Sequence, residues 1–322
     1  MTEISVERQP RLDGAITLAW LQKYGVYAAI AALLVFNAVA TPNFITTSNL
    51  KVQLFQATPI LLTALGMALV IGTEGVDLSV GAVIALTSAL LPLYLGYGVW
   101  MAILIALLGG AVSGAIGGTM VGFARVQPIV ATLALMIGLR GLAVMMNGAT
   151  AKSLTDPTVL DLGTKTVLTL PLMTWIALAV VLVVAFLMRR TTFGRQLSAI
   201  GDNPAASTLA GLPVRRVLVT VYVLSGVFAA LAGLFIAGNG AYADPANYGL
   251  QYELYAITAV VVGGTPLSGG RVAVLGTVAG TIFMQLVQAT LIQHNIQTSW
   301  EQMVQAVIIV LAVFAARGRS GR

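Results

Sequence analysis

The sequence predicts an all-α membrane protein that crosses a lipid bilayer about ten times. Hydrophobic residues occupy 58% of its 322 positions and charged residues only 9%, whereas soluble proteins carry roughly 25% charged residues. Between residues 24 and 124 the acids and bases are limited to Lys51, Glu74 and Asp77. The chain has no cysteine and a single histidine, His294, which excludes disulfides, thiol catalysis and a histidine metal cluster.

Ten apolar runs approach the length of about 20 residues that one helical crossing requires. In order they are residues 24–41, 55–72, 78–95, 99–123, 129–147, 171–188, 217–238, 253–266, 272–291 and 302–316. The run 253–266 is too short to cross alone, so we expect it to be half of a broken or re-entrant helix. The chain is therefore expected to form one transmembrane domain, 24–316, between a cytoplasmic segment, 1–23, and a cytoplasmic tail, 317–322.

Basic residues separate clearly when these spans are threaded alternately through the bilayer. One side receives 13 of the 17 lysines and arginines, the other receives Lys51, Lys152 and Lys165, and Arg140 lies inside a span. Because positively charged loops stay in the cytoplasm, we expect both termini there. The net charge of +6 is thus a signal of topology, and nucleic-acid binding is not expected.

A glycine repeat marks one face of the fourth span. Gly110, Gly114, Gly118 and Gly122 recur every four residues and therefore lie on the same side of a helix. Small residues at this spacing let two helix backbones approach closely inside a membrane. We interpret the stripe as a packing surface and not as a binding site.

Two glycine-rich segments interrupt the apolar pattern. Residues 72–81 place Glu74 and Asp77 between long apolar runs, and residues 263–271 repeat the same Leu-Ser step among glycines. Paired interruptions of this kind are typical of discontinuous helices beside a transport pathway. A pair of ordinary cytoplasmic turns, with Asp77 capping a helix that begins at Leu78, fits equally well. Both interpretations remain open at this point.

The longest cytoplasmic connection, residues 189–216, contains a complete short helix. Asn203 suits the N-cap, Pro204 the first helical position and Gly211 the stop. Two turns are unstable alone, so the helix needs a surface to dock against. Lipid is one such surface, but the alanine-rich face favours a protein groove. The residues expected to contact a partner are Asn203, Pro204, Ala205, Ala206, Ser207, Thr208, Leu209, Ala210 and Gly211.

Aromatic and polar residues gather in the outer segment 242–253. Tyr242, Asp244, Tyr248 and Glu253 suit hydrogen bonding and stacking against a sugar. Tyrosines also form ordinary belts at the membrane interface, and that plainer interpretation applies here too. We keep these four residues as candidates for the transport pathway.

Three further candidates lie in or beside the fifth span. They are Gln127, Arg140 and Asn147. An arginine inside a membrane span is a functional candidate by default, because burying its charge is costly. An arginine that pairs with a carboxylate for structural reasons has the same sequence signature.

Taken together, these motifs resemble the permease subunits of ABC importers for monosaccharides, the group that takes up ribose, arabinose, xylose and galactofuranose. The resemblance runs from about residue 43 to residue 317. The matching segments are 76–81, 127–133 followed by 140–141, 193–195, 199–203, 205–206, 211, 253–254, 256–257 and 261–264.

This resemblance implies a non-catalytic subunit that forms half of a permease dimer in the bacterial cytoplasmic (inner) membrane. A periplasmic or lipid-anchored sugar-binding protein would deliver the solute, and the helix at 204–210 would be the coupling helix that inserts into a cytoplasmic ATPase. ATP and Mg²⁺ would bind to that ATPase, because this chain has no G-x-x-x-x-G-K-[ST] loop and needs no cofactor itself. Arg271 and Asp244 resemble the galactofuranose branch, whose permease pairs with a second, different one.

A secondary transporter driven by an ion gradient is the alternative from another class. Glu74, Asp77 and Arg140 would then form a proton or cation relay. Transport by the purified chain, driven by a pH gradient and indifferent to ATP, would favour this alternative. An intramembrane enzyme is less compatible, because the sequence has neither a zinc-protease motif nor a serine–histidine pairing.

Overall fold

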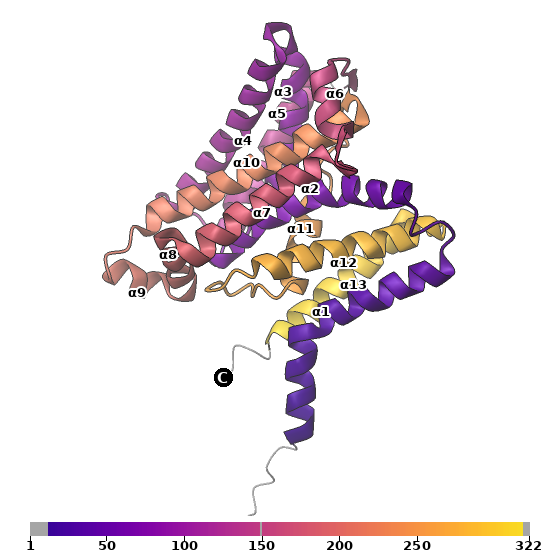
Figure 1. Cartoon of the computed structure of the whole chain (residues 1–322). Coiled ribbons are helices and arrows are strands. Elements are labelled where there is room, and N and C mark those ends of the chain that lie inside the picture. The colour runs from indigo at the N-terminus through magenta and orange to yellow at the C-terminus, as the bar shows by residue number, and fades with distance from the viewer. Residues whose placement is uncertain (1–11, 149, 318–322) are drawn as a thin grey trace, which may run out of the picture.

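The computed structural model describes residues 12–148 and 150–317, which form a bundle of helices (Figure 1). The helices are α1 (Leu12–Ala40), α2 (Thr47–Gly72), α3 (Val80–Tyr94), the 3-10 helix η1 (Leu95–Tyr97), α4 (Val99–Gly122), α5 (Pro128–Asn147), α6 (Pro157–Thr164), α7 (Leu172–Arg190), α8 (Thr192–Asp202), α9 (Pro204–Leu209), α10 (Val214–Gly240), α11 (Tyr252–Val262), α12 (Val274–Gln293) and α13 (Thr298–Arg317). Four two-residue strands complete the described structure: β1 (Lys152–Ser153), β2 (Thr166–Val167), β3 (Leu170–Pro171) and β4 (Tyr242–Ala243).

Seven helices in the described part of the chain are long and apolar enough to cross a membrane. They are α2, α3 with η1, α4, α5, α7, α10 and α12. Two shorter apolar stretches are Gly25–Ala40 within α1 and the whole of α11. The predicted all-α membrane fold is therefore confirmed, whereas ten crossings remain a prediction. The first helix begins at Leu12, well before the predicted start of the first span.

The helix α2 runs through the core of the bundle and packs against α7, α10, α11 and α12. Nearly every residue from Thr58 to Gly72 is buried. The predicted glycine stripe of α4 packs against α10, as its spacing indicated: a Cβ at Gly114 would overlap the carbonyl oxygen of Tyr222. The stripe is thus confirmed as a packing surface, because only glycine permits this separation of backbones.

The break between α2 and α3 differs from its predicted form. The helix α3 begins at Val80 and not at Leu78. The Oδ1 of Asp77 accepts hydrogen bonds from the backbone N–H of Ser79 at 3.0 Å and from its hydroxyl at 2.6 Å. This local bonding holds residues 77–79 in a turn and delays the helix. The hydroxyl of Ser225 in α10 donates to Oδ2 of the same carboxyl at 2.8 Å, so Asp77 ties the break to the core.

Several short elements that the sequence reading missed lie at one end of the bundle (Figure 1). The helix α6 starts after Asp156, whose Oδ1 accepts from the backbone N–H of Thr158 at 2.8 Å. It packs against α10, where Gly163 lies against the backbone of Asn239. The strands β1 and β4 pair antiparallel, as do β2 and β3. The helices α8 and α9 lie at the opposite end (Figure 1).

Candidate functional site

A cavity of about 290 Å³ opens between α2, α10, α11 and α12, with one wall from α7. Its polar lining consists of amides and phenols: Gln56, Asn239, Tyr248, Tyr252, Tyr255 and Gln288. The apolar walls include Phe55, Ile60 and Phe235. Small-molecule sites commonly combine apolar and aromatic walls with a few polar groups in this way.

Most of the polar lining is not engaged by the protein itself. Within the described residues, the side chains of Asn239, Tyr248, Tyr252 and Gln288 make no hydrogen bond. The side-chain amide of Gln56 is held by a residue that does not line the cavity: its Oε1 accepts a hydrogen bond from Nε2 of Gln285 at 2.9 Å. Burial raises the pKa of the Tyr248 phenol, with smaller contributions from Asp244 and Tyr242, so it remains a protonated hydrogen-bond donor at neutral pH.

The loop that carries Tyr248, residues 244–251, is a compact turn held by the carboxylate of Asp244 and by Arg140. The Oδ2 of Asp244 accepts from the side-chain amide of Asn247 at 2.8 Å. From α5, Nη1 of Arg140 donates to the carbonyl oxygens of Tyr248 at 3.2 Å and Pro245 at 3.4 Å. The arginine predicted as a pathway residue therefore contacts the backbone of the loop, and it holds one wall of the cavity in place.

The other candidates from the outer segment do not line the cavity. Tyr242 is 52% exposed in β4, and Asp244 caps its own turn. Glu253 lies against Gly81 in the first turn of α3, and its Oε2 is buried without a hydrogen bond from the described residues. The candidate Asn147, at the end of α5, does not line the cavity either. It is buried, and its side-chain amide donates to the carbonyl oxygens of Thr150 at 2.6 Å and Ala243 at 3.1 Å, which anchors β4.

Sequence reasoning missed the amides of the cavity, although a signal was present. Gln56, Asn239 and Gln288 each lie in a helix that is apolar enough to span a membrane. A polar side chain inside such a helix marks a functional position by default. The pathway candidates predicted from the sequence were charged residues, two tyrosines and the amides Gln127 and Asn147, so these three amides were not among them.

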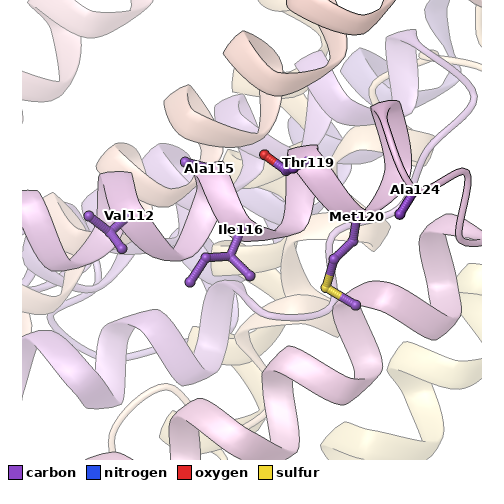
Figure 2. Close-up of a pocket in the computed structure, with 6 residues that line it drawn as sticks. All are labelled: Val112, Ala115, Ile116, Thr119, Met120 and Ala124. Carbon is purple, nitrogen blue, oxygen red and sulfur yellow. The ribbon is translucent and has the colours of Figure 1, made fainter.

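A second, larger hollow of about 390 Å³ lies along α4 and has a different character. Figure 2 shows its lining side chains, of which Val112, Ala115, Ile116, Thr119 and Met120 lie along that helix and Ala124 lies just after its end. Thr119 is the one polar side chain among them, and Val112 and Ile116 are exposed. An apolar face of this kind suits lipid chains, and we assign it no function.

At the opposite end of the bundle, α9 is a complete helix with both caps formed. The Oδ1 of Asn203 accepts from the backbone N–H of Ala206 at 2.9 Å. After the last turn, Gly211 adopts φ +76°, and the N–H of Leu212 donates to the carbonyl oxygen of Ser207 at 3.0 Å. These bonds form a Schellman cap. The predicted short helix is therefore confirmed.

The helix α9 is attached to α8 and presents one large apolar side chain to the outside. The hydroxyl of Ser207 donates to the carbonyl oxygen of Ala199 in α8 at 2.9 Å. Leu209 is 90% exposed. The remaining partner candidates Pro204, Ala205, Ala206 and Thr208 are also exposed. The side chains of this helix are thus available to another molecule.

The two glycine-rich breaks meet each other and the end of α8. The backbone N–H of Gly270 donates to the carbonyl oxygen of Gly72 at 3.0 Å. A Cβ at Gly201 in α8 would overlap that same carbonyl oxygen. Glu74 lies at this junction, exposed and in a left-handed turn (φ +64°) beside Gly269. One contact point therefore joins three segments that are distant in the sequence.

Comparison with known proteins identifies the family. Residues 49–313 match the family described as "Branched-chain amino acid transport system / permease component". The ribose import permease of Escherichia coli K12 is 36% identical over 303 residues, which cover 92% of this chain and 94% of that protein. The galactofuranose transporter permease of the same organism is 33% identical, covering 90% and 88%. The L-arabinose ABC transporter permease of Azospirillum brasilense is 30% identical, covering 91% and 87%.

The chain belongs to the monosaccharide ABC-importer permease family. No solved structure matches it. Permeases of this family are non-catalytic membrane subunits that work with ATPase and substrate-binding partners. No group of three metal-ligating side chains occurs in the described part of this permease.

The permease does not bring the residues of the predicted ion relay together. Asp77 is bonded to Ser79 and Ser225, whereas Arg140 is bonded to the carbonyls of the 244–251 loop. Glu74 is exposed at the junction with α8. Gln127 is likewise exposed, and it precedes α5 without a side-chain cap. No observation therefore favours the ion-coupled alternative.

Proposed function

We propose that this permease forms the membrane pathway of a bacterial importer that takes up a monosaccharide at the expense of ATP. It crosses the cytoplasmic membrane ten times, and both termini lie in the cytoplasm. A cytoplasmic ATPase binds ATP and Mg²⁺, and a periplasmic or lipid-anchored binding protein delivers the sugar. The charge split supports this orientation, because it puts α8 and α9 on the side rich in arginine.

The observation that carries the proposal is the geometry of α9. A two-turn helix is stable only when it is capped and anchored, and α9 has both caps and the Ser207–Ala199 bond. Its Leu209 is 90% exposed. Such a rigid, projecting helix suits insertion into a groove of an ATPase, and it has no evident purpose in an isolated transporter.

The junction at Gly201 supplies a route from α9 to the membrane. Movement of α9 is transferred to α8 by the bond between Ser207 and Ala199. Movement of α8 is transferred to both breaks, because Gly201 lies directly on the Gly72 carbonyl to which Gly270 is bonded. Packed backbones of this kind move together as rigid units. ATP-driven closure of the ATPase would thus displace two helix breaks at once.

The relatives support a sugar as the solute. Their names specify ribose, fructose, galactofuranose and L-arabinose. Within this class we retain galactofuranose or a related sugar, together with pairing to a second, different permease. The ribose and galactofuranose relatives are 36% and 33% identical, respectively, so the identities alone do not separate these sugars.

The proposal is tested by a charge placed on α9. In Leu209→Asp the exposed leucine is replaced without disturbing the bundle, so the permease should insert normally but lose its ATPase during purification and lose sugar uptake. Leu168→Asp is the matched control, because Leu168 is 81% exposed in the β2–β3 turn. Retained uptake in Leu209→Asp, or uptake driven by a pH gradient without the ATPase, would overturn the proposal.

A further inference from the structure

We propose that the cavity between α2, α10, α11 and α12 is a binding site for one neutral, polyhydroxylated solute of monosaccharide size. Its lining residues come from five helices of this chain and from the loop that carries Tyr248. This inference rests on the proposed sugar transport. It adds that each permease binds a sugar within its own helix bundle, in addition to any passage of sugar between two permeases.

The charge of the lining indicates a neutral ligand. No aspartate, glutamate, lysine or arginine lines the cavity among the described residues. Two charged residues lie beside lining residues but do not line the cavity themselves: Arg140 is bonded to loop carbonyls, and Glu253, next to Tyr252, lies against Gly81. A charged solute would enter an apolar surrounding without a counter-charge, which is strongly unfavourable.

The polar groups indicate hydroxyls as the recognised feature. Four side chains on the loop and on three helices turn to the cavity with no hydrogen-bond partner in the described structure: Asn239, Tyr248, Tyr252 and Gln288. Asn239 is exposed and the other three are half-buried, so all four are able to bond to a molecule that enters the cavity. Amides and phenols both donate and accept, as hydroxyls do. A solute with several hydroxyls would satisfy all four groups at once, and water would do so in its absence.

The walls and the size fit a sugar ring. Phe55 and Phe235 contribute apolar aromatic surface, and the rings of Tyr252 and Tyr255 meet edge to face at 6.3 Å between centroids. A sugar presents apolar C–H faces as well as hydroxyls, so it matches such mixed walls. The volume of about 290 Å³ is just below the usual range for small-molecule sites, about 300–1,000 Å³, as suits a ligand as small as a single sugar ring.

The site is also held ready before any ligand binds. Nε2 of Gln285 donates to Oε1 of Gln53 at 2.8 Å and of Gln56 at 2.9 Å, which fixes the lining amide of Gln56. The phenol of Tyr248 reaches the end of α10 because Gly240 has no Cβ, and its loop is held by Arg140. A prearranged site loses less conformational entropy on binding.

The absence of native cysteine allows a direct test of this site. Asn239→Cys is introduced into the complete importer in membrane vesicles without ATP, and its reaction with a membrane-impermeant maleimide is timed. Saturating D-ribose or D-galactose should slow labelling, by about ten-fold at ten times the dissociation constant. Galacturonate, which is negatively charged, should not slow it.

Two further variants separate the site from indirect effects. Leu168→Cys, on the exposed β2–β3 turn, should react at the same rate with and without sugar. Gln288→Met keeps the volume of the side chain but removes its amide. When this change is combined with Asn239→Cys, the protection by sugar should be lost. Protection that persists with Gln288→Met would overturn the assignment.

The outcomes also distinguish this inference from the proposed function. ATP-driven uptake with no sugar protection at Asn239→Cys would overturn the cavity site and leave the importer assignment intact. Sugar protection without ATP-driven uptake would support the site and contradict the importer assignment. A third outcome would also overturn the site. If labelling is slow in lipid vesicles, is unchanged by sugar and becomes fast in detergent, a lipid occupies the cavity.

Discussion

The backbone N–H of Gly270 donates to the carbonyl oxygen of Gly72 at 3.0 Å. This one bond joins the break after α2 to the break after α11, and Gly201 of α8 lies against the same carbonyl. The contact requires glycine at position 201, since any Cβ there would overlap the Gly72 oxygen. The helix α8 is therefore linked to both breaks through close backbone contacts, and α9 is attached to α8 by the bond from the Ser207 hydroxyl to the Ala199 carbonyl.

Gly201→Ala should uncouple ATP hydrolysis from transport. The added methyl group forces α8 away from the breaks, and overpacking of this kind costs about 1–3 kcal/mol. Because α9 itself is unchanged, the ATPase should still assemble and hydrolyse ATP, while uptake per ATP falls sharply. Uptake and hydrolysis measured together on the reconstituted importer provide the test. Gly138→Ala is the control, as a Cβ there has nothing within 4 Å; equal coupling in both variants would contradict the prediction.

Ser207→Ala should loosen α9 from α8. It removes the hydroxyl that bonds to the Ala199 carbonyl at 2.9 Å, and a hydrogen bond of this type contributes about 1 kcal/mol. Hydrogen exchange of the α9 amides should accelerate by about five-fold, the factor that corresponds to this energy. Thr208→Ala is a matched control, because that hydroxyl bonds to Pro204 within α9 at 2.9 Å. Equal exchange in the two variants would show that the interhelical bond has no special importance.

Ser225→Ala should destabilise the break between α2 and α3. The serine donates to the buried carboxyl of Asp77 at 2.8 Å, and its loss leaves one carboxyl oxygen without that partner. Leaving a buried hydrogen-bonding group without its partner costs about 1–3 kcal/mol, so the unfolding midpoint in detergent should fall. Ser113→Ala removes a buried hydroxyl that bonds only to the Gly109 carbonyl of its own helix at 2.7 Å. A midpoint no lower in Ser225→Ala than in Ser113→Ala would refute this role of Asp77.

Arg140→Gln should free the loop that carries Tyr248. The guanidinium bonds to two loop carbonyls, at 3.2 and 3.4 Å, are lost, so backbone amides of residues 244–251 should exchange faster with solvent. Sugar protection at Asn239→Cys should weaken in the same variant, because the cavity wall is no longer held. Lys165→Gln serves as the control. That lysine forms an exposed ion pair with Asp161 at 3.0 Å, and such pairs contribute about 0–1 kcal/mol. Unchanged exchange in Arg140→Gln would assign the arginine another role.

Local signals in the sequence were sufficient for some parts of this protein. The helix α9 could be predicted because Asn203, Pro204 and Gly211 act on their immediate neighbours, and cap geometry depends on a few adjacent residues. The glycine stripe of α4 could be predicted for a similar reason: helical periodicity alone places it on one face. The start of α3 was placed two residues early, because Asp77 bonds to the backbone and hydroxyl of Ser79 and prolongs the turn.

The sequence by itself determined the membrane class, the family and the capped helix α9, because composition, motifs and caps are carried by neighbouring residues. Only the tertiary structure decided which residues form the cavity. Gln56 and Gln288 lie on α2 and α12, far apart in the chain, and they meet at one cavity because these helices pack side by side. The same holds for Gly72, Gly201 and Gly270. Such contacts depend on how whole helices pack, and no local pattern encodes that arrangement.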